Sequence, residues 1–146
     1  GGVFIDNEGN WILGFNMGYK YATNIYMEIL ALLHGIKLAI TKKLFPLVIE
    51  TDCLELLNHL KSNNGLYQNL IDDCRYLLRM AHDPQLNHIF REANGVADLL
   101  AKNGCSLNTF CTLQIFAVAP VFTFHALKRD NLGTMWPRLS SYCNNS

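Results

Sequence analysis

Three acidic residues stand where side chains from separate elements could gather around a cation. Glu28 lies on the apolar side of a helical stretch, Asp52 follows an apolar run, and Asp98 falls in the first turn of a short helical segment. Carboxylates that gather repel one another and raise each other's pKa unless a cation neutralises them. Magnesium prefers such oxygen ligands. Together the three acids suggest a divalent-metal site at one edge of a mixed sheet.

Each acid also has a plainer interpretation. Asp52 is a good helix N-cap, and Glu55, three residues later, would complete a capping box. Glu28 could lie near a helix end, close to solvent, where an acid favours the helix dipole, and Asp98 could play the same part in its own helix. Because a capping residue can also be a metal ligand, the role of Asp52 depends on whether Glu28 and Asp98 lie close to it.

The elements that would position the acids follow from hydrophobic patterns. The run 47–52 is short, apolar and β-branched, which is typical of a strand buried on both faces, and the leucines of 54–60 have helical spacing. Asp52 lies at this junction, and ligands collect at the carboxyl ends of strands in open α/β sheets. The helix predicted over 25–41 places Glu28 beside Leu32 and Ile36, where an unpaired charge would be costly.

The remaining pattern predicts a hairpin, two further strands, two helices and an appendage. Its parts are strands at 1–5 and 11–15 around a turn at 6–10, a weak strand at 17–21, a helix over 66–81, a strand over 85–90, a loop over 91–95 and a helix over 96–103 closed by Gly104 as a left-handed cap. Residues 110–127 are aromatic and aliphatic, but Pro120 and His125 suit poorly a membrane helix of about 20 apolar residues. We therefore expect an appendage packed on the domain, and a mobile end at 144–146.

Composition limits the class of protein. The chain has 146 residues, of which half are hydrophobic and 16% are charged, so one packed domain with a tail is expected. The net charge of zero argues against a strong nonspecific polyanion binder but not against a metal-dependent enzyme acting on nucleic acid. The five cysteines are odd in number and form no Cys-x-x-Cys pair, which favours thiols in a reducing, intracellular compartment, nuclear or cytoplasmic.

The order and content of four segments resemble the type 1 ribonuclease H-like domain, most closely its plant reverse-transcriptase-like branch. The segments are Gly-Gly-Val-Phe-Ile at 1–5 with the turn to Trp11, Met-Glu-Ile-Leu-Ala-Leu at 27–32, Ile-Glu-Thr-Asp at 49–52, and His-Ile-Phe-Arg-Glu-Ala-Asn at 88–94 followed by Ala-Asp-Leu-Leu-Ala-Lys at 97–102. The resemblance covers about residues 1–104 and leaves 105–146 as a C-terminal extension. It implies an α/β fold, a ribonuclease H-like mixed sheet with flanking helices, whose first strand is incomplete here.

The resemblance implies roles for five residues. Glu28, Asp52 and Asp98 match three of the four metal-binding acids of that family, His88 matches a histidine that shuttles a proton or helps product leave, and Asn94 takes the place of an asparagine near the substrate. The family hydrolyses the RNA strand of an RNA–DNA hybrid with two Mg²⁺ ions about 4 Å apart, for which Mn²⁺ is an alternative. The implied partner is nucleic acid; we expect no membrane association, and a monomer.

One departure from the family pattern sets a limit on activity. The family's first acid is an Asp, usually followed by Gly, on a strand upstream of 1–5, and this chain contains no Asp-Gly. Asp6 falls in the turn at the far end of that strand and cannot replace it. We therefore expect an N-terminally truncated domain in which half of a central strand is absent, leaving backbone groups of its neighbours unpaired. Cleavage of hybrid by this chain should be impaired.

Two hypotheses remain open. The first is a hybrid ribonuclease-type domain that acts by two-metal phosphodiester hydrolysis, as the retained Glu28, Asp52, Asp98 and His88 favour. The alternative is a non-catalytic ribonuclease H-like module that binds nucleic acid or protein, as the zero net charge and the absent first acid favour.

Overall fold

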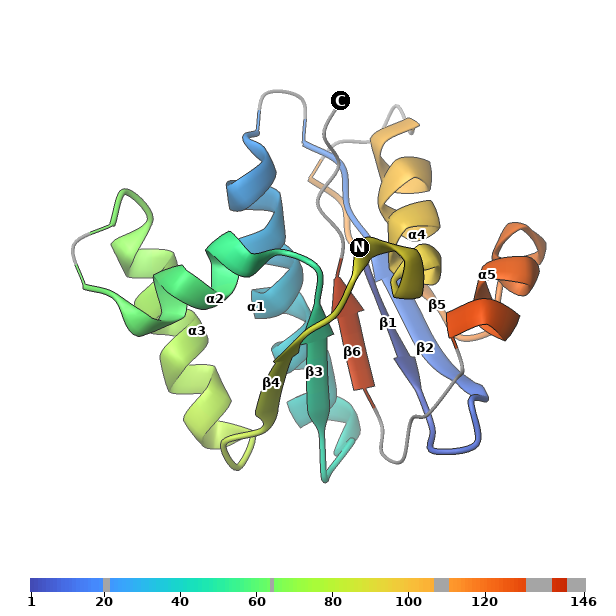
Figure 1. The fold of residues 1–146 in the computed structure, drawn as a ribbon, viewed down its shortest axis with the longest axis horizontal. Helices are drawn as coiled ribbons and strands as arrows, with labels where there is room; N and C mark the ends of the chain where they lie inside the picture. Colours follow the sequence, from blue (N-terminus) through green and yellow to red (C-terminus); the bar gives the residue numbers. More distant parts are fainter. Residues whose placement is uncertain (20–21, 64, 107–110, 131–137, 142–146) are drawn as a thin grey trace.

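The computed structural model places six strands in one mixed sheet with helices on both of its faces (Figure 1). It describes residues 1–19, 22–63, 65–106, 111–130 and 138–141. The strands are β1 (Gly2–Ile5), β2 (Trp11–Asn16), β3 (Val48–Thr51), β4 (Gln85–His88), β5 (Gln114–Phe116) and β6 (Arg138–Ser141). The helices are α1 (Asn24–Lys42), α2 (Leu54–Lys61), α3 (Gln68–Met80), α4 (Gly95–Ser106) and α5 (Phe124–Asp130), with short 3₁₀ turns η1 (Arg91–Ala93) and η2 (Val121–Thr123).

The sheet has the strand order β4-β3-β6-β1-β2-β5. The strand β3 runs parallel to both of its neighbours, β4 and β6, whereas β1 is antiparallel to both β6 and β2. The order and the mixed directions are those of an α/β fold, as the sequence predicts. The parallel half brings the ends of β3 and β4 to the same edge of the sheet, where Thr51 lies opposite His88.

The hairpin β1–β2 forms where the sequence predicts it, and local chemistry explains its turn. The Asp6 carboxylate accepts the backbone N–H groups of Glu8 and Asn10 at 2.9 and 2.8 Å, and Gly9 takes a positive φ of 83°. These bonds lower the pKa of Asp6, the bond from Asn10 most of all, although burial opposes them. Asp6 is therefore a turn residue whose carboxylate binds the backbone of its own loop, as expected of an Asx turn.

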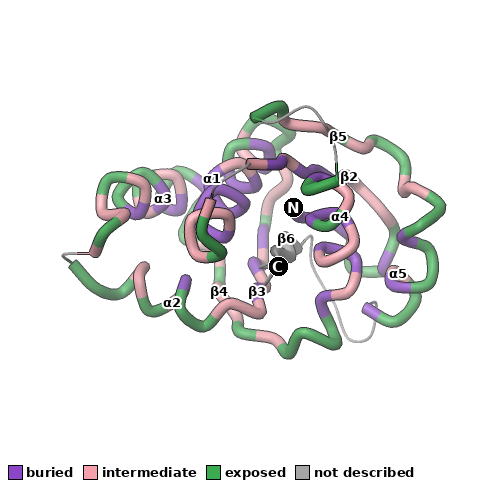
Figure 2. Tube along the Cα trace, turned by 90° about the horizontal axis from the view of Figure 1, so that it is seen from above, coloured by how far each residue is buried: buried purple, intermediate pink, exposed green. Residues whose placement is uncertain are grey.

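Two cores form because residues of β1 alternate between the two faces of the sheet. Phe4 packs with Ile29, Ile36 and Ile49 beneath α1 and α3, whereas Val3 and Ile5 pack with Val96, Leu100 and Ala126 of α4 and α5. Figure 2 shows α1 and α3 on one side of the line of strands, and α4 and α5 on the other. The helix α1 is apolar and long enough to cross a membrane by length and composition alone, but 56% of its most apolar window is buried in this fold.

The centre of the sheet differs from the sequence-based expectation. The sequence predicts that half of a central strand is absent and that backbone groups of its neighbours are left unpaired. In the structure β6, from the end of the chain, lies between β1 and β3 and pairs with residues 2–5 of β1 and 48–51 of β3. Any extended segment can pair in this way, because backbone donors and acceptors are the same whatever the side chains. The strands β5 and β6 therefore complete the sheet that residues 1–104 begin.

Two local predictions are wrong. Residues 17–19 form no strand, and the other two residues of that predicted strand lie outside the described residues. Gly104 does not cap α4 but lies inside it, where a Cβ would come within 3.1 Å of Asn16 Cβ; close packing of α4 on β2 therefore explains the glycine. The apolar stretch after Phe110 is divided between β5, η2 and α5, so its described part forms no membrane-length helix. The predicted mobile end at 144–146 lies outside the described residues.

Candidate active site

The candidate site lies at the edge of the sheet where β3 and β4 end, between α1 and the start of α4. Its central residue is Thr51, which is buried and ends β3. The Thr51 hydroxyl lies 3.5 Å from Glu28 Oε2, a long contact for a hydrogen bond, and accepts the N–H of Cys53 at 3.1 Å. Thr51 therefore links the buried face of α1 to the turn that begins α2.

Glu28 is fully buried, as the helical pattern predicts. It belongs to the second turn of α1, whose N-cap Thr23 accepts the N–H of Tyr26, and its exposed fraction is 0%. The interpretation of Glu28 as a solvent-facing acid at the helix end is therefore wrong. Glu28 instead points its carboxylate toward Thr51, at the end of the strand that leads to Asp52. A carboxylate is rarely retained in such a place without a partner or a function.

Asp52 is buried at the rim of the sheet beside a cation. Its side chain is 3% exposed, and its Oδ2 lies 3.6 Å from Nε of Arg91, whose side chain is half exposed. Burial raises the pKa of Asp52, and the Arg91 charge and a hydrogen bond from Asn94 offset only part of that shift. The predicted capping role is wrong, because the N-cap of α2 is Cys53 and no side-chain oxygen caps this helix.

Asp98 lies in the first turn of α4, as predicted, and is paired within its own helix. Lys102 Nζ lies 3.0 Å from Asp98 Oδ2, an ion pair between residues four apart. The Asp98 backbone N–H donates to the carbonyl of Asn94 at 3.2 Å. Asn94 is fully buried, and through this bond it fixes the start of the helix that carries Asp98.

His88 ends β4 and is exposed at the same rim. Its backbone is in register with Thr51, and its ring meets the ring of Phe90 edge-on at a centroid distance of 6.2 Å. The side chain is therefore available to a molecule bound at this edge. Phe90 is itself 78% exposed, which is unusual for a phenylalanine and adds an apolar surface next to the histidine.

The structure places Glu28, Asp52 and His88 near the ends of β3 and β4 and Asp98 in the first turn of α4, but does not close them into a metal cage. Within the described ranges, no group of three His, Cys, Asp or Glu side chains is arranged to hold a metal ion. The donor chemistry still suits magnesium, because Mg²⁺ is often held by one or two carboxylates together with water and substrate phosphate. Glu28, which contacts Thr51, and Asp52, which follows Thr51 in the chain, are the candidates for such a pair.

Sequence reasoning did not identify the two cations that pair with the acids. Lys102 follows Asp98 by four residues, so helical spacing would have predicted their ion pair. No local signal pairs Arg91 with Asp52, because they are brought together only by the parallel pairing of β3 and β4 and the turn of η1. The three acids thus differ in setting: Glu28 is fully buried, and the other two each have a basic side chain beside them.

The fold and this acidic rim define an α/β domain of the ribonuclease H-like class. A family model described as reverse transcriptase-like matches residues 1–104, so the chain belongs to the reverse transcriptase-like family. The chain is also 28% identical over 141 residues to a protein of Arabidopsis thaliana named "Putative ribonuclease H protein At1g65750". The match covers 94% of this chain but 22% of that relative, so the chain spans less than a quarter of its length. No solved structure matches the chain significantly.

Proposed function

We propose that the chain acts on RNA–DNA hybrids through a divalent-metal site formed by Glu28, Asp52 and Asp98. The observation that carries the proposal is the fully buried Glu28 carboxylate, directed to the end of the strand that precedes Asp52. Burial of an acid at this position is hard to explain by packing alone, because it costs stability. The membership of the family and the similarity to the Arabidopsis protein support nucleic acid as the partner.

In this proposal Mg²⁺, or Mn²⁺ in its place, would be held by Glu28 and Asp52, with Asp98 as the third acid. Bound divalent ions would activate water and stabilise the leaving oxygen of the phosphodiester. Asn94, which is fully buried and whose side chain lowers the pKa of the Asp52 carboxylate, would help to hold Asp52 in position. His88, exposed at the same edge, would transfer a proton or assist departure of product. The 2′-hydroxyl would let the site select the RNA strand.

We further propose that hydrolysis by the 146-residue chain is slow. Arg91 and Lys102 lie beside two of the three acids and would compete with metal ions for them. The same ion pairs, together with the absence of a three-ligand group within the described ranges, favour the alternative of a non-catalytic module. Arg91 would serve either function, since a guanidinium matches the geometry of phosphate oxygens.

Titration calorimetry with Mg²⁺ and cleavage of a fluorescently labelled hybrid test the proposal together. We expect weak Mg²⁺ binding that is lost in Glu28→Gln and Asp52→Asn, and slow cleavage that is lost in the same variants. The matched control is Asp73→Asn, an exposed acid of α3, a helix that contributes no residue to the proposed site, and it should change neither. Metal binding without cleavage would support the non-catalytic module. Metal binding that survives both rim substitutions would refute the proposed site, and fast cleavage by the unmodified chain would refute slow hydrolysis.

A further inference from the structure

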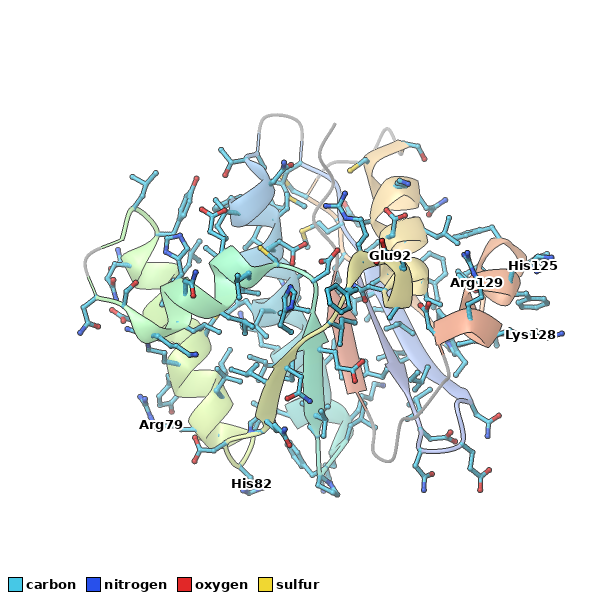
Figure 3. The ribbon with its side chains drawn as sticks, in the orientation of Figure 1. Arg79, His82, Glu92, His125, Lys128 and Arg129 are labelled. Carbon is cyan, nitrogen blue, oxygen red and sulfur yellow. The ribbon has the colours of Figure 1, made fainter. Side chains whose placement is uncertain are left out.

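The helix α5 presents an outer face with a distinct chemical character. Its inner residues, Ala126 and Asp130, are buried against α4, and the contact buries part of Leu127 as well. The other four residues, Phe124, His125, Lys128 and Arg129, are all exposed. Figure 3 shows His125 and Lys128 at the outer edge of the molecule, and Arg129 on the side of α5 that faces α4.

The charge of this face is positive without compensation from its own segment. Across residues 111–129 the sequence holds Lys128 and Arg129 but no acid. The next residue, Asp130, is buried and its Oδ2 accepts the backbone N–H of Val96 at 2.8 Å, so it points into the protein and not toward solvent. A local positive surface therefore exists although the whole chain has no net charge, and such a surface attracts phosphate groups.

Aromatic side chains lie exposed beside these cations. Phe124 is 51% exposed, and Phe122, in the turn η2 that precedes the helix, is 44% exposed. Aliphatic side chains of the same segment, Val118 and Val121, are 79% and 78% exposed. An exposed apolar patch bordered by charge is typical of a binding surface. Aromatic rings next to cations are the combination that binds unpaired bases and their phosphates, because every base offers a face for stacking.

The position of α5 is firmly set relative to the helix that carries Asp98. A Cβ on Gly95, the first residue of α4, would lie 3.3 Å from Ala126 Cβ and 3.6 Å from Arg129 Nη2. The absence of a side chain at Gly95 thus lets Arg129 lie against the start of α4. Both views of the chain place α5 next to α4 (Figures 1 and 2).

We propose that this outer face of α5, together with Phe122 of the preceding turn η2, is a contact surface for single-stranded nucleic acid. It uses none of the residues proposed for the metal site and goes beyond the proposed function. A single strand is the expected occupant because stacking on phenylalanine requires a base that is not paired. Phosphates would contact the two cations, while Phe122 and Phe124 would stack on neighbouring bases.

Fluorescence anisotropy with a labelled oligothymidine of about 12 nucleotides tests the surface. The titration is done with the whole chain and a chelator, so that the proposed metal site cannot contribute. Phe124→Ala should weaken binding about fivefold or more, as loss of one stacked base does. The double variant Lys128→Gln/Arg129→Gln should reduce the slope of log affinity against log salt by about 1.4, since each phosphate contact on a single strand contributes roughly 0.7.

Matched controls come from the opposite end of the molecule. Tyr76→Ala removes an aromatic side chain of similar exposure, 56%, from α3, and Lys61→Gln/Arg79→Gln removes two exposed cations. Arg79 lies far from α5 in Figure 3. These controls should leave the affinity and the salt slope unchanged, and circular dichroism should confirm that all variants fold. Equal losses in controls and α5 variants would overturn the proposal, as would no binding by the wild-type chain. The proposal would also be overturned if the α5 substitutions weakened binding to phosphatidylserine vesicles but not binding to the oligonucleotide, because the surface would then be one that binds membranes.

Discussion

The bond between Asp130 and the start of α4 is expected to contribute measurably to stability. Asp130 Oδ2 lies 2.8 Å from the backbone nitrogen of Val96, and both residues are buried. The N–H groups of a first helical turn have no partner within the helix, so a carboxylate from elsewhere in the chain can satisfy one of them. Here that carboxylate comes from a residue 34 positions later, which joins α5 to α4.

The expected magnitude follows from the nature of the bond. A hydrogen bond to a charged acceptor contributes about 1.5–3 kcal/mol, and loss of a helix cap costs about 0.5–2 kcal/mol. Because Asp130→Ala also relieves the cost of burying a charge, we expect a net loss of about 2 kcal/mol in the free energy of unfolding. Asp130→Asn keeps an oxygen acceptor but loses the charge, so about half of that loss is expected.

Urea unfolding followed by circular dichroism measures the effect. With a slope of about 2 kcal/mol per molar urea, Asp130→Ala should lower the midpoint by about 1 M. The control is Asp73→Ala, an exposed acid of α3, which should stay within about 0.5 kcal/mol of wild type. If Asp130→Ala unfolds at the same urea concentration as wild type, the bond to Val96 does not stabilise the protein and the reasoning fails.

Two further predictions concern groups whose pKa burial changes. Burial raises the pKa of Asp52 above its usual 3.8. Between 3.8 and the raised pKa, the folded chain therefore binds more protons than the unfolded chain. The free energy of unfolding falls as the pH rises through this window. Asp52→Asn should therefore be more stable than wild type at neutral pH, and the difference should disappear below the pKa of Asp52 in the unfolded chain. Urea titrations measure both stabilities, and a less stable variant at neutral pH would contradict this prediction. Burial raises the pKa of the Cys74 thiol to about 12, whereas Cys105 is exposed. Iodoacetamide near neutral pH should alkylate Cys105 and leave Cys74 unmodified until the chain is denatured, as peptide mass mapping would show; rapid alkylation of Cys74 in the folded chain would contradict its burial.

Much of the fold and part of the site could be predicted, because the spacing and type of neighbouring residues indicate helices, strands and their buried faces. Helical spacing identified α1 and placed Glu28 on its buried face, and β-branched residues identified β3 with Asp52 at its end. The Asx turn at Asp6 predicted the hairpin. The capping role of Asp52 was predicted wrongly, because a capping pattern in the sequence does not reveal that the carboxylate turns toward Arg91 instead.

The sequence by itself determined the hairpin β1–β2, the strands β3 and β4 and the helices α1 to α4, and placed Glu28 on a buried face, because periodicity and residue type act over a few neighbouring positions. Only the tertiary structure decided that β6 lies between β1 and β3, that Arg91 meets Asp52, and that Asp130 caps α4. Such contacts join residues distant in sequence. A strand edge can pair with any extended segment that the fold brings beside it, and a buried N–H can donate to any acceptor placed next to it. No local sequence pattern therefore specifies which distant segment makes the contact.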